Sequence, residues 1–245
     1  MVHFQTRIIS YLCLSSLIGL TIGAFVSLAA NVFVNGIKYF EALRLTLLTK
    51  FNFFVYFEYI VPFAWLTAGF FLVFLIKKVV GCTSWQGPAD AIYCAHRPDK
   101  NMDIRQGFGT VLAAFTSLSA GASLGQYGPI VHMGALIGGL FKKYNLSSIH
   151  LSNDIFLGCG VAAAISAGFH APIAGVIFAH EAILRHFSVR AIAPIAISSI
   201  CAASVGEWLN LSDNILALDF YPEPLIKQVP ALLIGGFIFS LIAVF

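Results

Sequence analysis

The sequence predicts an all-α integral membrane protein, and three observations carry this prediction. Of its 245 residues, 59% are hydrophobic and only 10% are charged, with a mean hydropathy of +0.88. That is too little charge to cover a soluble domain of this size. Several stretches lack Asp, Glu, Lys and Arg over roughly 20 residues, the length that crosses a bilayer as a helix. Glycine and proline interrupt two of them, so the bundle should contain tilted, broken helices.

The first predicted spans are residues 8–37 and 59–76, the second ending at Lys77 and Lys78. Residues 39–57 are aromatic and mixed in polarity, and they can continue the first helix before crossing an interface. Residues 81–105 turn polar and contain Gly81, Gly87 and Pro88, which predicts a loop with a short helix or a re-entrant piece.

The third stretch, residues 106–141, has His132 and Tyr127 as its only ionisable side chains, and Gly125-Gln126-Tyr127-Gly128-Pro129 interrupts it. Irregular backbone at membrane depth must be covered by protein or line a water-filled cavity. Pro129 suits the first turn of a new helix, where its missing N–H would have no partner. A helix N-terminus carries about half a positive charge and unpaired N–H groups. The N–H groups of Gly128 and Ile130 are therefore predicted to face an anion.

A second break follows at residues 168–172, again with a proline, Pro172, opening the next helix. Paired, interrupted apolar segments indicate a transport site built from broken helices. The remaining apolar runs are residues 191–206 and 228–245. The last run has no cap, basic flank or polar tail, so we expect the chain to be cut within a longer helix.

These segments resemble a known family. GASLGQYGPIVHMGALIGG (residues 121–139) resembles the G-R-E-G-P segment of the CLC chloride channels and chloride/proton antiporters. GVAAAISAGFHAPIAGVIFAHE (residues 160–181) resembles the segment that follows it in that family. The resemblance implies a CLC-type inverted-repeat bundle, of which residues 1–245 would form the N-terminal half: the first repeat and the start of the second. It also implies a homodimer with residues 171–205 in the interface.

The resemblance places Tyr127 where the family has its gating glutamate, and Gln126 where it has an arginine. A tyrosine side chain has a reference pKa of about 10 in water, so it does not exchange protons near neutral pH. It can still plug the anion site by its bulk, or donate a hydrogen bond to an anion. The alternative is an interfacial tyrosine that only fills space.

Two further positions depart from the family's pattern. Glu181 aligns with the first of two carboxylates and Ala182 with the second, the internal proton-transfer glutamate of the antiporters. A proton or gating role is a hypothesis for Glu181 and for His132. The alternatives are an i,i+4 ion pair of Glu181 with Arg185 and a packing role for the histidine.

The inner anion site of the family is a G-S-G-I-P loop. Here Ser84-Trp85-Gln86-Gly87-Pro88 ends on the matching proline, but the serine falls out of register. Thr83, Ser84 and Gln86 are candidate donors, with an ordinary loop as the alternative.

Three classes of function follow. We expect passive chloride transport through a CLC-type pore in a cell or inner membrane, because no acid occupies position 127 or 182. A chloride/proton antiporter with another proton path, or a partial homologue that does not transport, are the alternatives.

An enzyme is not expected, because His180-Glu181 begins a zinc motif that Leu184 breaks at the fifth position. The five cysteines form no C-x-x-C pair, so neither a metal nor another cofactor is indicated. A net charge of +3 gives no reason to expect nucleic acid as a partner.

Overall fold

The computed structural model describes residues 2–50, 57–97, 99–143 and 151–209, together with residues 229–230, 233–235, 237 and 241. The chain divides into two units, residues 1–212 and residues 213–245. The expected helix at residues 228–245 lies largely outside the described residues.

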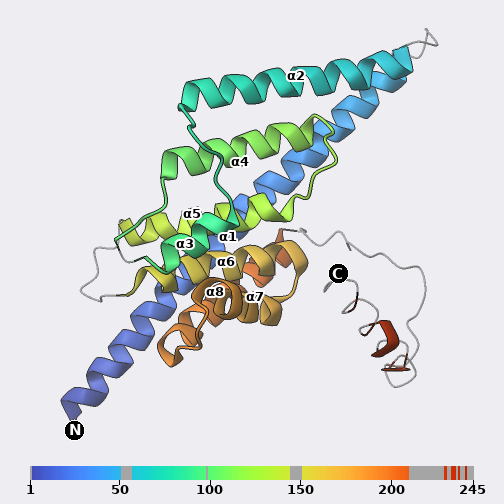
Figure 1. Cartoon of the computed structure of the whole chain (residues 1–245). Helices are drawn as coiled ribbons and strands as arrows, with labels where there is room; N and C mark the ends of the chain where they lie inside the picture. Colours follow the sequence, from blue (N-terminus) through green and yellow to red (C-terminus); the bar gives the residue numbers. More distant parts are fainter. Residues whose placement is uncertain are drawn as a thin grey trace. The chain divides into compact units, whose positions relative to one another are not determined.

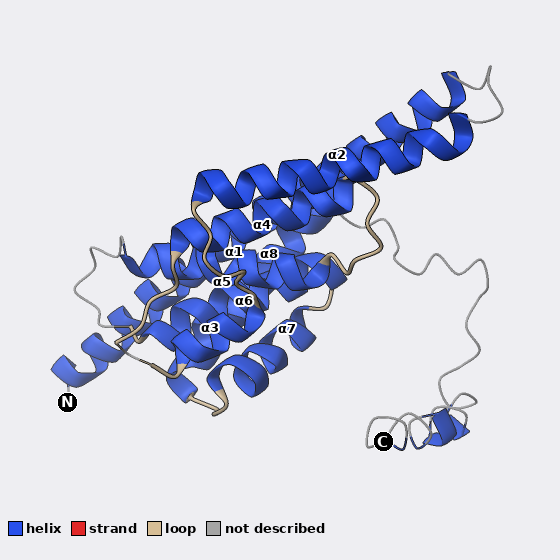
Figure 2. Cartoon of the chain, turned by 45° about the horizontal axis from the view of Figure 1, so that its top comes forward, coloured by secondary structure: helices blue, strands red, loops and turns tan. Residues whose placement is uncertain are grey.

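The described elements of the first unit are all helical (Figures 1 and 2). They are α1 (Val2–Lys50), α2 (Phe57–Val80), α3 (Pro88–Ala95), α4 (Ile104–Ser119), α5 (Tyr127–Lys143), α6 (Asn153–Phe169), α7 (Pro172–Phe178), the π-helix η1 (Ala179–Leu184) and α8 (Val189–Trp208). The first helix therefore continues to Lys50, and residues 81–105 contain the expected short helix. Both predicted breaks are present, before α5 and before α7.

Within the described residues, three helices contain apolar segments long enough to cross a membrane: Tyr11–Leu47, Val61–Val80 and Val189–Trp208. Helix α6 and the segment from α7 through η1 are shorter apolar helices. The predicted class, a multi-pass all-α integral membrane protein, is confirmed by this arrangement.

Helix α6 lies at the centre of the unit and contacts α1, α5, α7 and α8. It packs closely against α5 because small residues face one another. A Cβ atom added to Gly134 would collide with the carbonyl oxygen of Gly160, and one added to Gly138 would collide with that of Phe156. In a bilayer, where lipid is as apolar as leucine, close backbone approach of this kind drives helix association.

Helix α1 packs against α8 by the same device. Gly19 and Gly23 lie against the backbone carbonyls of Pro194 and Ser198. One turn further, the Ser27 hydroxyl donates to the carbonyl of Ala202 at 2.9 Å. These contacts hold α1 close to α8, and both helices also pack against α6.

Candidate functional site

Helix α5 begins at Tyr127, so Pro129 lies in its first turn as predicted. Within the described part of the chain, no hydrogen-bond acceptor reaches the N–H groups of Tyr127 and Gly128. The first turn of α5 contains no acidic residue. This end therefore keeps the positive potential of a helix N-terminus. Gly125 and Gly128 are exposed and Gln126 is half-buried.

Ile130 corrects part of the predicted donor set. Its N–H donates to the Gln126 carbonyl at 3.3 Å, and the residue is 1% exposed. The first intrahelical bond of α5 thus uses this group. The N–H groups that remain at the helix end are those of Tyr127 and Gly128.

The Tyr127 side chain connects the two helix breaks. Its ring stacks on Phe169, the last residue of α6, with ring centroids 4.0 Å apart and an interplanar angle of 23°. Gly168 leaves room for the ring, because a Cβ atom there would lie 3.2 Å from Tyr127 Cδ1. A neutral aromatic pair therefore lies between the start of α5 and the end of α6.

The second break turns at His170, whose backbone is left-handed, with φ 52°. Pro172 then starts α7, as the sequence predicted. The His170 Nε2 atom is buried and has no hydrogen-bond partner among the described residues. The second break therefore has a polar side chain of its own, the imidazole of His170, directly after Phe169.

The inner loop differs from the start of α5, because the N-terminus of α3 is capped by an acid of its own first turn. The Gly87 N–H donates to Asp90 Oδ2 at 2.7 Å, and the Asp90 N–H donates to the Gly87 carbonyl at 3.0 Å. Pro88 has no N–H. In the described part of the chain, no acceptor reaches the Ala89 N–H.

The three candidate donors of the inner loop have different surroundings. The Thr83 hydroxyl donates to Gln106 Oε1 at 3.3 Å, so it already has a partner. Ser84 is exposed. The backbone N–H of Gln86 donates to the Thr110 hydroxyl at 3.1 Å. The Gln86 Oε1 atom is buried and unpaired within the described residues.

His132 joins the inner loop to α5. It is 1% exposed, and its Nδ1 lies 3.0 Å from the Gly87 carbonyl oxygen. Since a carbonyl only accepts, Nδ1 carries the proton in this contact. His132 lies five positions after Tyr127, about 7.5 Å further along α5. The start of α3 therefore lies beside the first two turns of α5.

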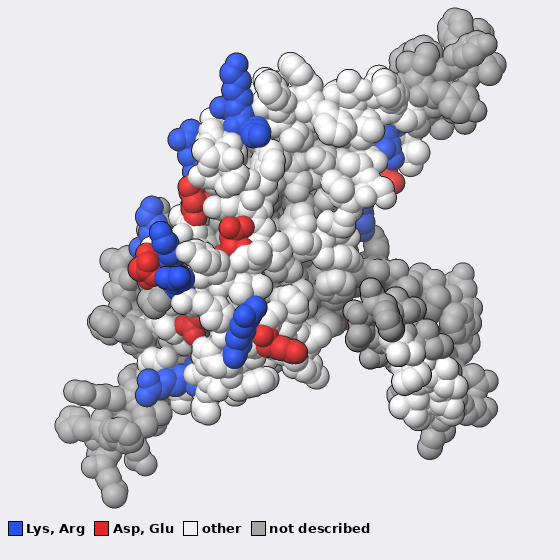
Figure 3. Space-filling model, viewed as in Figure 1, with Lys and Arg blue, Asp and Glu red and all other residues white. Residues whose placement is uncertain are grey.

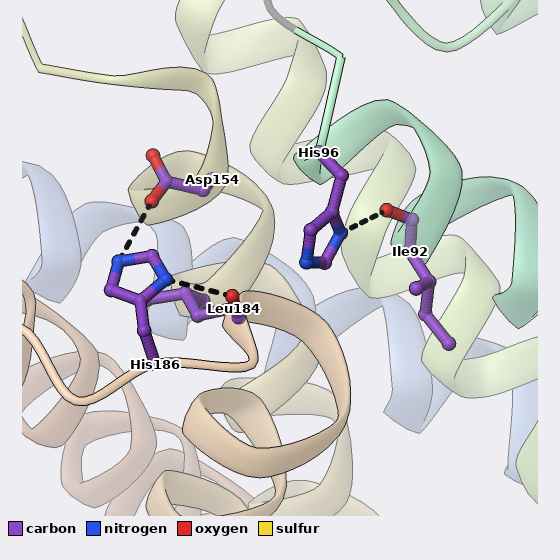
Figure 4. A network of polar contacts seen from close by, with 5 residues as sticks. All are labelled: Ile92, His96, Asp154, Leu184 and His186. Carbon is purple, nitrogen blue, oxygen red and sulfur yellow. Dashed lines mark hydrogen bonds and ion pairs between the residues drawn. The ribbon is translucent and has the colours of Figure 1, made fainter.

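Glu181 does not form the expected ion pair with Arg185. Among the described residues no such pair is present, Glu181 is exposed, and Arg185 has a left-handed backbone with φ 56°. The physical reason is the π-helix η1, whose wider turn moves position i+4 out of line. Instead, His186 Nε2 lies 3.7 Å from Asp154 Oδ2 at the start of α6 (Figure 4).

The structure adds two site residues that the sequence reasoning missed, Asp90 and Phe169. Asp90 had a local signal, since an acidic residue three positions after a helix cap commonly bonds back to it. The stack on Phe169 had no local signal, because the two rings are 42 residues apart in the chain. No group of three or more His, Cys, Asp or Glu among the described residues is arranged to hold a metal ion.

These features define a multi-pass membrane protein whose broken helices meet inside the bundle, an architecture that channels and secondary transporters use. Residues 68–245 match the family model for the voltage-gated chloride channel. The chain therefore belongs to the voltage-gated chloride channel, or CLC, family.

Individual relatives agree with this membership. The chain is 28% identical over 107 residues to a protein of Ralstonia nicotianae whose name describes it as a ClcB-like chloride channel, covering 42% of this chain and 25% of that one. It is 28% identical over 130 residues to the H(+)/Cl(-) exchange transporter ClcA of Vibrio parahaemolyticus, covering 52% and 28%. The matches thus span about a quarter of each curated relative.

The fold is also that of a solved relative. The crystal structure of a CLC-type fluoride/proton antiporter superposes with a TM-score of 0.69 at 22% identity. The match covers 94% of this chain and 55% of that one. The predicted CLC-type bundle is thereby confirmed.

Proposed function

We propose that this chain forms the N-terminal half of a pore that conducts chloride passively, without stoichiometric proton movement. One observation carries the proposal: among the described residues no acceptor reaches two N–H groups at the start of α5, and its first turn has no acid. Chloride needs N–H or O–H donors and a partial positive field, both of which a helix end supplies. A full charge at the bilayer centre costs at least about 2.5–3.5 kcal/mol, and a helix end avoids that cost.

Tyr127 takes the place of the family's gating glutamate in this proposal. A phenol ring stacked on Phe169 closes the anion path by its bulk, not by a carboxylate that competes with chloride. A proton bound and released at this position would require a group that titrates near neutral pH. The neutral stack therefore supports uncoupled flux.

The antiporter alternative has its own support. His132, His170 and His180 each have a buried Nε2 atom without a partner among the described residues, and an unpaired nitrogen can accept a proton.

Residues 171–205 are further proposed to form a homodimer interface, as the family resemblance implies.

Flux measurements on the full-length protein in proteoliposomes distinguish these functions. A chloride gradient is imposed, the voltage is clamped with a potassium ionophore, and a trapped dye reports internal pH. We expect chloride flux with no proton movement above that of empty liposomes. Proton uptake that follows the chloride gradient would overturn the uncoupled mechanism, and absence of chloride flux would favour a homologue that does not transport.

A further inference from the structure

A cavity of about 710 Å³ lies where the start of α4 meets the end of α5, away from both breaks. Its polar and charged lining comprises Asn101, Asp103, Arg105, Lys142, Lys143 and Asn153. Three cations thus face one carboxylate. That carboxylate is committed to the cap of α4, because Asp103 Oδ1 accepts the N–H groups of Arg105 and Gln106 at 3.0 and 3.2 Å. The cavity therefore has a positive potential.

Two of these cations are held by neutral oxygens. Lys142 Nζ donates to Asn101 Oδ1 at 2.8 Å, and an Arg105 guanidinium nitrogen lies 3.4 Å from the Val79 carbonyl oxygen. Within the described part of the chain, neither Lys142 nor Arg105 has a carboxylate at ion-pair distance. Both charges are oriented but not neutralised, which suits them to bind a phosphate group.

An apolar groove of about 410 Å³ adjoins this cavity. It is lined by residues of α1, α4 and α5, chiefly Phe25, Phe108, Met133, Ile137, Leu140 and Phe141. Leu140 lines both hollows, so they lie on either side of one side chain. From Met133 to Phe141 the groove follows α5 for about 12 Å. Phe25 and Phe108 are 58% and 38% exposed, so the groove is open to the surroundings of the helices.

The end of the bundle that holds the cavity is also rich in other cations. Lys77 and Lys78 end α2, and Lys142 and Lys143 end α5. Figure 3 shows most of the Lys and Arg atoms of this view on the left of the molecule, with several Asp and Glu side chains among them. Basic residues mark the cytoplasmic side of membrane proteins, and that leaflet carries the anionic lipids.

We propose that the cavity and the groove together bind one anionic phospholipid. Its phosphate lies against Arg105 and Lys142, and one acyl chain lies along the groove between α1, α4 and α5. Because Leu140 lines both hollows, the cationic cavity and the apolar groove are neighbours. A phospholipid has the matching arrangement, with a charged headgroup next to an apolar acyl chain. A free phosphate ion would use the cavity and leave the groove empty.

The test measures thermal unfolding of the full-length protein in detergent with phosphatidylglycerol, phosphatidylcholine or glycerol phosphate added. We expect a concentration-dependent rise in Tm with phosphatidylglycerol, and little or none with the other two. The double variant R105Q/K142Q should weaken the apparent affinity for phosphatidylglycerol by about ten- to a hundredfold, the value of lost charge-assisted hydrogen bonds. The matched control K77Q/K78Q removes the same charge outside the cavity and should keep the wild-type affinity.

A second variant tests the groove with the cations intact. Ala29 also lines the groove, and Ala29→Phe should fill it and reduce the phosphatidylglycerol shift. If Ala29→Phe fails to fold, the single variant Arg105→Gln, at an exposed position, still tests the headgroup site. Equal shifts with phosphatidylcholine would overturn recognition of a negative lipid. Equal shifts with glycerol phosphate would identify a free phosphate site, and equal losses in R105Q/K142Q and K77Q/K78Q would show only a general charge effect.

Discussion

The starts of α5 and α3 both contain a Gly-Pro pair, yet their N–H groups meet different surroundings. At α5 the N–H groups of Tyr127 and Gly128 are unpaired among the described residues. At α3 the Gly87 N–H donates to the carboxylate of Asp90. A helix end covered by a carboxylate has lost most of its attraction for a second anion. The Gly-Pro pair thus predicts where a helix starts, and the next acidic residue decides whether that start stays positive.

The comparison also assigns different roles to two neutral side chains. Tyr127 stacks across the open end of α5, where it can control access. His132 bonds to the Gly87 carbonyl behind the capped end of α3, where it fixes the position of the loop. On this basis we propose that the start of α5 contributes more to anion binding than the capped start of α3.

The largest expected effect comes from separating α5 from α6. Gly134→Ala places a Cβ atom against the Gly160 carbonyl, and overpacking of this kind costs about 1–3 kcal/mol. It should also shift Tyr127 off Phe169 and abolish chloride flux. Thermal unfolding in detergent and proteoliposome flux are the measurements.

Gly139→Ala is the matched control for this change. Its nearest atom would be Leu157 Cδ2 at 3.8 Å, an ordinary contact. Because alanine favours a helix over glycine, we expect unchanged or higher stability. Equal destabilisation by the two variants would show that the close approach at Gly134 has no special importance.

Much of this arrangement could be predicted from the sequence. The lack of charge fixed the class, and glycine with proline located the starts of α5 and α7 to within two residues. Pro172 opens α7 because a proline at that position has no N–H to leave unpaired. These features are local, so the sequence alone is enough to find them.

Other features depend on packing between distant segments. The pairing of Tyr127 with Phe169 requires α5 to cross α6 at Gly134, which no local pattern shows. The predicted ion pair of Glu181 was wrong because a π-turn intervenes, and a π-turn has no sequence signature here. The positive end of the bundle was also hidden. Its Lys and Arg residues lie on several links of the chain, which come together only in the folded bundle.

A change at Tyr127 tests the outer end and should have an intermediate effect. Stacked rings contribute about 0.5–1.5 kcal/mol, so removing the ring with Tyr127→Ala should raise chloride flux by up to about tenfold if the stack holds the path closed. Tyr127→Phe keeps the ring and removes only the hydroxyl, so its flux should match the wild type. An equal rise in both variants would assign the gate to the hydroxyl, and no change in either would leave Tyr127 as a space-filling residue.

The smallest expected effect concerns the inner end, where two changes at Asp90 separate charge from capping. Asp90→Asn keeps an oxygen that can accept the Gly87 N–H but removes the negative charge, so the loss of stability should be no more than about 0.3–1 kcal/mol. A carboxylate near a helix N-terminus is worth about 0.3–1 kcal/mol, and removing its charge should lower the half-saturating chloride concentration by about two- to fivefold. Asp90→Ala removes the charge and the cap together, so it should show the same shift in chloride dependence and a loss of about 1 kcal/mol in stability. Chloride dependence of flux and thermal unfolding are the two measurements.

If neither variant alters the chloride dependence, the inner end lies off the anion path and the pore depends on the start of α5 alone. A larger effect of Asp90→Asn than of Tyr127→Ala would reverse the comparison, because it would make the capped end of α3 the one that limits flux.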